Sequence, residues 1–104
     1  MCTIFAGQDT TNYEFHTRSV RLGGHCTSVR LEKKFWEILD HIAASQDMNT
    51  SRFLTTIYDE ALDINGDVSN FASLLRCSCI LYLSDTEKTM SIANQQLAFA
   101  QKET

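Results

Sequence analysis

Four cysteines and three histidines are the residues of this chain best suited to metal binding or nucleophilic chemistry. Cys77 and Cys79 form a C-x-C pair, and in a helix that spacing turns the two thiols about 200° apart. The histidines are widely scattered, at His16, His25 and His41. We therefore expect no metal site and no cofactor.

Cys2 is placed like the nucleophile of enzymes that expose an N-terminal cysteine once Met1 is removed. Such an enzyme needs a large scaffold, a substrate pocket and oxyanion donors, which 104 residues with this pattern do not supply. The sequence also has no phosphate-cradling glycine loop, metalloprotease helix or nucleophile elbow. It therefore predicts no catalytic residues and no enzymatic activity.

Basic residues are concentrated in one segment of an acidic chain. The net charge is -4, yet residues 16–34 carry five basic residues against Glu32 alone, and residues 35–104 carry four bases and ten acids. This distribution predicts one anion-facing side, and an incidental charge cluster is the alternative. The five bases are Arg18, Arg21, Arg30, Lys33 and Lys34.

The cysteines and the hydropathy pattern indicate a cellular compartment. The cysteine spacing is not a disulfide framework, and no signal peptide is recognisable, so we expect reduced thiols and a cytoplasmic location. The longest apolar run, Cys79 to Leu83, is far shorter than the roughly 20 residues that cross a bilayer. The sequence therefore predicts no membrane span.

Two short alternating segments precede the helical part of the chain. The tetrapeptide S-V-R-L occurs at Ser19–Leu22 and again at Ser28–Leu31, with Gly23-Gly24 between. In each copy the apolar residues fall on one face of a strand and the polar residues on the other. The Gly-Gly step indicates a hairpin within one chain, but the strands could equally pair between chains.

The pattern then changes to a helical period. A first helix is expected from Glu32 to about Ser45, and a second is capped by Asn49 and ends at Asn65-Gly66. A third should run from a Ser69 cap to about Leu83 and bury Phe71, Leu74, Leu75, Ile80 and Leu81. Residues 1–15 are interpreted as an N-terminal arm, and residues 85–104 as a tail or a marginal helix.

A polar-alternating strand followed by two helices with a capped turn resembles the ribbon-helix-helix family of bacterial and phage regulators. The most specific part is T-S-V-R-L-E-x-x-F-W, which begins at Thr27. Together with MCTIFAGQ and FASLLRC, it is similar to a subgroup of ribbon-helix-helix proteins that carry the domain inside a longer chain. The likeness spans roughly residues 1 to 84.

The resemblance implies a mainly α fold with a short β-ribbon, built as a homodimer. Its antiparallel two-stranded ribbon would be intermolecular, with one strand from each protomer, and would enter the major groove of double-stranded DNA. The outward residues of the strand would be Cys26, Ser28 and Arg30. The start of the second helix would bind phosphate through Asn49, Thr50, Ser51 and Arg52.

Two positions depart from the family pattern. Cys26 stands where relatives commonly carry a longer polar or basic side chain, and a thiol discriminates poorly between bases. Asp47 stands where the turn before the second helix usually has glycine. Aspartate tolerates the left-handed conformation, but its carboxylate would lie near an expected phosphate. We therefore expect base readout to rest on fewer contacts because of Cys26, and DNA affinity to be lower because of Asp47.

These observations predict a ribbon-helix-helix domain over residues 16–66 and an additional C-terminal helix over residues 67–84 that packs on the same core. The expected function is a sequence-specific, nucleoid-associated DNA-binding regulator, specifically a repressor, with dimers that could assemble further. A dimeric protein-interaction module of the same fold without DNA binding is the alternative. The basic residues Arg18, Arg21, Lys33 and Lys34 are added to the candidate DNA contacts.

Overall fold

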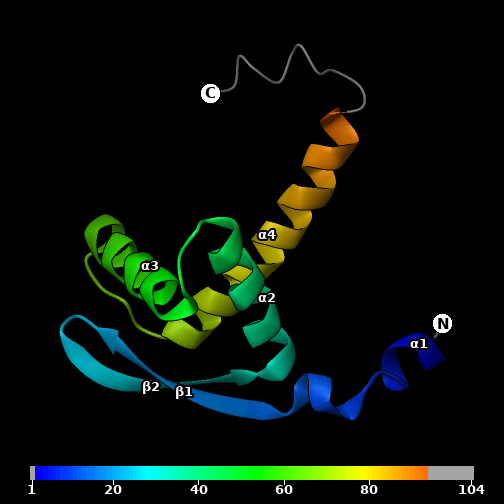
Figure 1. Ribbon diagram of the computed structural model, residues 1–104, viewed down its shortest axis with the longest axis horizontal. Helices are drawn as coiled ribbons and strands as arrows, with labels where there is room; N and C mark the ends of the chain where they lie inside the picture. The colour runs from blue at the N-terminus through cyan, green and yellow to red at the C-terminus, as the bar shows by residue number, and fades with distance from the viewer. Residues whose placement is uncertain (1, 94–104) are drawn as a thin grey trace.

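The computed structural model describes residues 2–93 of the chain. A β-hairpin lies beneath a group of helices, and the last helix extends away from the body of the molecule (Figure 1). In chain order the elements are α1 (Cys2–Ala6), the 3-10 helix η1 (Thr10–Tyr13), β1 (Phe15–Leu22), β2 (His25–Glu32), α2 (Lys33–Ser45), α3 (Thr50–Asn65) and α4 (Phe71–Ala93).

The two strands pair with each other inside one chain. They form an antiparallel sheet in which Leu22 lies opposite His25 and Phe15 opposite Glu32. Gly23 and Gly24 have φ values of 59° and 82°, and two successive positive φ angles make the tight turn whose twist matches that of the strands. Of the two pairings that the sequence left open, β1 and β2 form the hairpin within one chain, because Gly-Gly permits this turn; pairing of β2 with a second chain stays a prediction.

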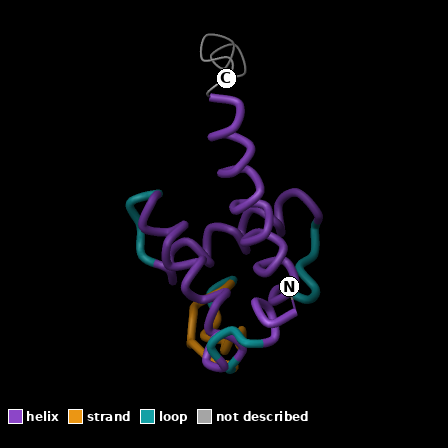
Figure 2. Tube along the Cα trace, turned by 90° about the vertical axis from the view of Figure 1, so that its right-hand side faces the viewer, coloured by secondary structure: helices purple, strands orange, loops and turns teal. Residues whose placement is uncertain are grey.

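One face of the hairpin carries the apolar residues and packs on the helices. The buried positions alternate along both strands, as the S-V-R-L repeat predicts, and they are Val20, Leu22, Val29 and Leu31. Alternation places every second side chain on the opposite face of the sheet. In Figure 2, turned by 90°, the helices that follow the hairpin in the chain lie above the strands. The residues of the other face of the hairpin are exposed.

Helix α2 supplies the centre of the core. It buries Trp36, Leu39, Ile42 and Ala43, while Phe35 and Ile38 pack against the edge of the core. The Trp36 indole Nε1 donates a hydrogen bond of 2.9 Å to the carbonyl oxygen of His16, so its one polar group is satisfied. Trp36 is therefore a residue of the core, and Phe35 packs at its edge.

The turn between α2 and α3 is built as its residues predict. Asp47 adopts a left-handed φ of 60°, and the side chain of Asn49 caps α3 by accepting a hydrogen bond from the Arg52 amide. Gly66 ends α3 with a φ of 76° and donates its amide hydrogen to the carbonyl of Leu62.

Helix α4 differs from its prediction at both ends and on one face. Asn70, and not Ser69, lies next to its start and accepts from the Ser73 amide at 3.4 Å. The helix buries Leu75 and Cys79, whereas Ile80 and Leu81 are 56% and 63% exposed. Residues 80 and 81 are turned about 100° and 200° from Cys79, so they leave the face that meets the core.

The ends of the chain are partly described. The region interpreted as an arm holds α1 and η1, and the carbonyl of Glu14 accepts from the Lys33 amide at 2.7 Å. Residues 85–93 continue α4, and the predicted tail or marginal helix beyond them lies outside the described residues. No helix within residues 2–93 is long and apolar enough to cross a membrane.

Candidate nucleic-acid interface

The outward face of the hairpin brings six polar side chains together. Alternation along each strand turns them away from the helices, and all six residues are exposed. Cross-strand neighbours on this face are Thr17 with Arg30, Ser19 with Ser28, and Arg21 with Cys26. The predicted outward positions Cys26, Ser28 and Arg30 thus lie beside a matching row from β1.

The outer edge of β2 is free for pairing. The two-residue turn makes Leu22 and His25 a hydrogen-bonded pair, so the main-chain groups of Cys26, Ser28 and Arg30 point away from β1. Within residues 2–93 the sheet has two strands, and none lies on this edge. A hollow of about 270 Å³ lies beside β2, lined by four of its residues together with Leu22 of β1 and with Phe71 and Ala72 of α4.

The outer edge of β1 is, in contrast, partly covered by a helix. The Thr55 hydroxyl of α3 donates a hydrogen bond of 2.8 Å to the main-chain carbonyl of Arg21. Because that carbonyl points away from β2, the contact blocks a further strand at this point. A strand from another chain would therefore pair with the outer edge of β2 and not with that of β1.

The two arginines of the outward face are held near the sheet surface. The Arg30 guanidinium carbon lies 4.0 Å from the centre of the Phe15 ring, a cation–π geometry. Arg21 donates from Nη1 to the carbonyl of Gly24 at 3.0 Å. Both retain donors that can reach an anion or a base edge.

Arg18 lies on the other face, where it links the hairpin to the helices. Its guanidinium donates two hydrogen bonds to Asp40, at 2.8 and 3.0 Å, and lies 4.4 Å from the centre of the Trp36 ring. Thr50 donates to the same carboxylate at 2.6 Å. The Arg18 guanidinium and then the Thr50 hydroxyl hold the pKa of Asp40 below its ordinary value. Arg18 is thus engaged in structure and is not part of the outward face.

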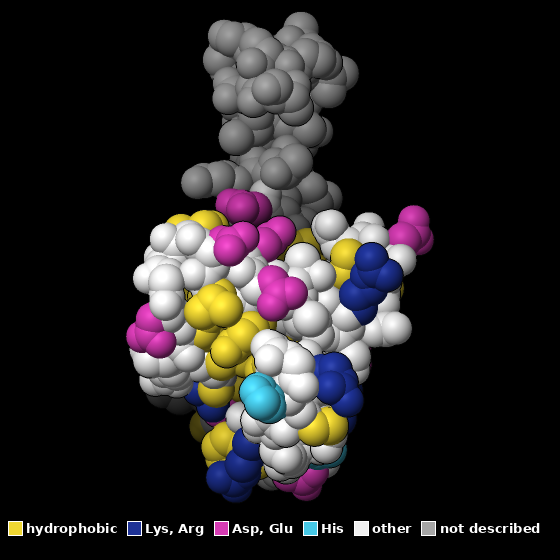
Figure 3. Space-filling model, turned by 90° about the vertical axis from the view of Figure 1, so that its left-hand side faces the viewer, with side chains coloured by type: hydrophobic (Ala, Val, Ile, Leu, Met, Phe, Trp, Pro, Cys, Tyr) yellow, Lys and Arg dark blue, Asp and Glu magenta, His cyan; other side chains and the backbone are white. Residues whose placement is uncertain are grey.

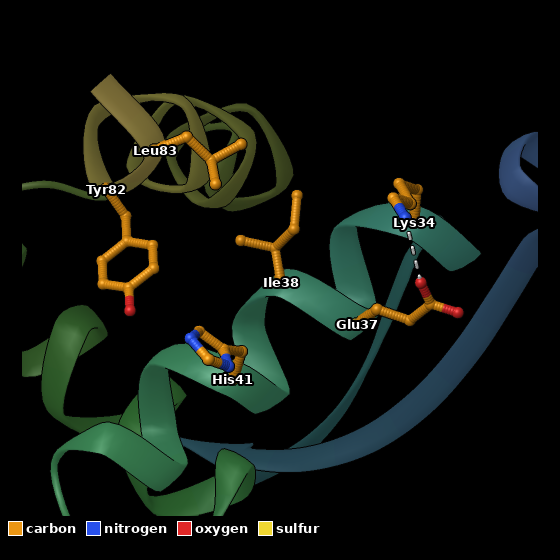
Figure 4. A pocket seen from close by; sticks show the side chains of 6 residues that line it. All are labelled: Lys34, Glu37, Ile38, His41, Tyr82 and Leu83. Carbon is orange, nitrogen blue, oxygen red and sulfur yellow. Dashed lines mark ion pairs between the residues drawn. The ribbon is translucent and has the colours of Figure 1, made fainter. Parts of the chain in front are cut away.

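Lys33 and Lys34 also have partners within the chain. Both ammonium groups lie near the Glu37 carboxylate, at 3.3 and 3.5 Å, and they lower its pKa. Figure 4 shows Lys34 and Glu37 beside an apolar hollow between α2 and α4, where the His41 and Tyr82 rings meet edge to face. The residues that line this hollow, Lys34 included, belong to α2 and α4 and not to the hairpin.

The start of α3 offers backbone donors. Asn49 satisfies the amide of Arg52, and the first amides of a helix have no partner within it. Ser51 and Arg52 are exposed there, whereas the Thr50 hydroxyl is already donated to Asp40. Of the four residues predicted for phosphate binding, Asn49, Ser51 and Arg52 are exposed, and the Asn49 side chain is used as the cap.

Two residues of the site are absent from the sequence-based candidates. Phe15 was included in the N-terminal arm, although it continues the alternation of β1 and shares the face of Thr17 and Ser19. Asp40 joins three elements, and its partner Arg18 lies 22 residues away in the chain. The alternation could have identified Phe15, but no local pattern indicates the Asp40 contact.

Charge is unevenly distributed over the molecule. In Figure 3 acidic side chains gather over the upper part of the described surface, with a hydrophobic patch below them. The hairpin carries Arg21 and Arg30 on its outward face, with Glu32 as the acid of the same face. Burial opposes ionisation of Glu32, but backbone hydrogen bonding and the Arg76 guanidinium at 3.0 Å outweigh it and lower the pKa of the carboxyl. Because Glu32 is paired in this way, the outward face is the anion-compatible side.

A β-ribbon that precedes a pair of helices, with a polar outer face, defines a class of small proteins that contact DNA through strands. Residues 15–83 match the ribbon-helix-helix domain family, and the chain belongs to that family. Its members are DNA-binding regulators that generally bind as dimers and are typically not enzymes.

A solved structure shares the fold of this chain. The chain is similar to an uncharacterized protein from Bordetella pertussis Tohama I, at 38% sequence identity and a TM-score of 0.83. The similarity covers 86% of this chain and 71% of that chain. No curated protein matches the sequence.

Proposed function

We propose that the protein is a sequence-specific DNA-binding transcriptional regulator, a repressor, that acts as a homodimer joined through β2. The observation that carries this proposal is the coincidence of two features on one strand. The free edge of β2 can pair with a second copy, and the same strand presents Ser28 and Arg30 outward. A repressor of this kind would act on the nucleoid, in the cytoplasm.

The proposed dimer contains a four-stranded sheet in the order β1, β2, β2 of the partner, β1 of the partner. Its central pair is the intermolecular ribbon of the family, and each β1 flanks it. Neighbouring strands lie about 4.8 Å apart. The major groove is about 12 Å wide and admits two strands, so four do not fit inside it. The twisted sheet therefore inserts its central pair, and the β1 strands lie over the phosphates at the rims.

This placement gives the outward residues different roles. Arg30 can donate two hydrogen bonds to guanine, and Ser28 can donate to or accept from several bases. Cys26 adds little discrimination because a thiol is a weak hydrogen-bond partner. Arg21 of β1, together with Ser51 and Arg52 at the start of α3, would bind phosphates, which positions the protein without reading sequence.

In vitro selection of DNA by the purified full chain tests the proposal. We expect an inverted-repeat consensus and binding that weakens with salt, with a log–log slope of about 0.9 per phosphate contact. Arg30→Ala should lose about 1–3 kcal/mol of preference at one base position in each half-site. Arg21→Ala is the matched control, since it should weaken all sequences equally and reduce the salt slope.

The result that would overturn this assignment is a selection without a consensus. A dimer that binds no DNA would instead be the protein-interaction module of the same fold. Normal site preference in Arg30→Ala would show that another residue reads the bases. Analytical ultracentrifugation of the same samples should detect the dimer, and a strictly monomeric protein on a palindromic site would contradict the pairing through β2.

A further inference from the structure

We infer that Phe15 is a positioning residue that fixes the Arg30 guanidinium for base recognition. This inference rests on the proposed function and adds a residue that acts through another one. Phe15 lies on β1 and Arg30 on β2, on the same outward face, with the guanidinium carbon 4.0 Å from the ring centre. The register makes them diagonal neighbours, since Thr17 is the residue directly opposite Arg30.

The exposure of Phe15 is not explained by the core. Its side chain is 48% exposed at the start of a strand whose other face is buried, and it is not among the residues that pack against the core. A phenylalanine on a solvent-facing strand surface contributes little to burial. The contact that it does make is with Arg30, whose guanidinium carbon lies over the Phe15 ring.

Stacking suits an arginine that must read a base. The guanidinium is planar, so a ring on its face leaves the N–H groups at its edge free for the two acceptors of guanine. An unrestrained arginine on an exposed strand samples many rotamers, and ordering it on binding costs free energy. Phe15 restricts those rotamers before DNA arrives, which is preorganisation. Within residues 2–93 no ring lies over Arg21, which is held by a hydrogen bond to the Gly24 carbonyl.

The test compares binding to the selected duplex with binding to the same duplex after replacement of the guanine read by Arg30. Phe15→Leu keeps an apolar strand residue but removes the ring. It should reduce the ratio of the two affinities about two- to five-fold, the range for a cation–π contact at an exposed site. Phe15→Tyr should restore the ratio, because it restores the ring. A residue that only supported folding would not change base preference selectively.

Two controls keep the outcomes distinct. Phe5→Leu makes the same change at a phenylalanine that is 63% exposed on α1, and it should leave the ratio unchanged. In an Arg30→Ala background, Phe15→Leu should have no further effect on the ratio. An unchanged or increased ratio in Phe15→Leu, or an equal effect without Arg30, would overturn the inference. If the unaltered protein selects no sequence, the proposed function fails instead.

Discussion

Replacement of Asp40 by asparagine tests how the helices are fixed to the hairpin. The carboxylate on α2 accepts two hydrogen bonds from Arg18 of β1 and one from Thr50 of α3. Asparagine keeps the size of the side chain but removes the charge and one of the two acceptor oxygens. It therefore loosens the start of α3 as well as the hairpin.

The magnitude follows from the exposure of the partners. The Arg18 and Asp40 side chains are 41% and 45% exposed, so their ion pair is screened and worth about 0.5–1 kcal/mol. Weakening the Thr50 hydrogen bond adds about 0.5–1 kcal/mol. We expect Asp40→Asn to lower the free energy of unfolding by about 1–2 kcal/mol, or the melting temperature by about 4–10 °C.

The effect should depend on pH in a defined direction. The pKa of Asp40 in the folded protein lies below its ordinary value of 3.8, because Arg18 and then Thr50 favour the ionised form. The stabilisation is therefore complete above the ordinary value and is lost as the pH falls through the lowered one. The difference between the unaltered protein and Asp40→Asn should shrink below pH 4.

Urea unfolding monitored by Trp36, the single tryptophan and a buried one, measures this effect. Samples at neutral pH, pH 4 and pH 3 cover the transition, and a double-mutant cycle with Arg18→Ala isolates the pair. Glu37→Gln is the control, since its carboxylate contacts only lysines of the same helix among the described residues. No loss at neutral pH, or an equal loss at pH 3, would refute the reasoning.

Three further predictions concern single positions. Asp47→Asn should keep the left-handed turn and increase DNA affinity, because it removes a carboxylate near the start of α3; an unchanged affinity in a gel shift would contradict this. Gly23→Ala should lower the melting temperature more than Gly24→Ala does. Both glycines have a positive φ, which costs an alanine about 1–2 kcal/mol, but only at position 23 does the new Cβ lie 3.3 Å from the Tyr58 ring. Cys79 is buried, and burial raises the pKa of its thiol to about 11, so a thiol reagent should label the exposed Cys26 and Cys77 first. Mass spectrometry measures the order of labelling, and rapid labelling of Cys79 in the folded protein would contradict its burial.

Much of the fold could be predicted because local patterns determined it. The alternation of Val20, Leu22, Val29 and Leu31 predicts the buried face of the hairpin, and those residues are buried. The Asn49 cap and the Gly66 stop mark the ends of α3 correctly. In each case one or a few neighbouring residues decide the structure, so no distant contact has to be known.

Other features depend on distant partners and were not predicted. Arg18 alternates with Val20 on the buried side, so strand periodicity separates it from Arg21, but its role as a bridge requires Asp40 to lie opposite. Helix α4 is apolar on several sides, so its periodicity could not distinguish Cys79, which is buried, from Ile80, which is exposed. The chain pairing of β2 was also ambiguous, since a free strand edge accepts either partner.

One chain buries a core of its own, and this bears on how DNA occupancy would depend on protein concentration. Leu31, Leu39, Leu54 and Leu75 have no exposed surface even without a second copy. Protomers can therefore remain folded while separate, so dilution should dissociate the dimer without unfolding it, and the melting temperature should fall only by the part that assembly contributes. Occupancy of a two-fold site would then rise with roughly the square of the protein concentration below the dimer dissociation constant. A modest change in synthesis or degradation would thus give a steeper change in gene expression.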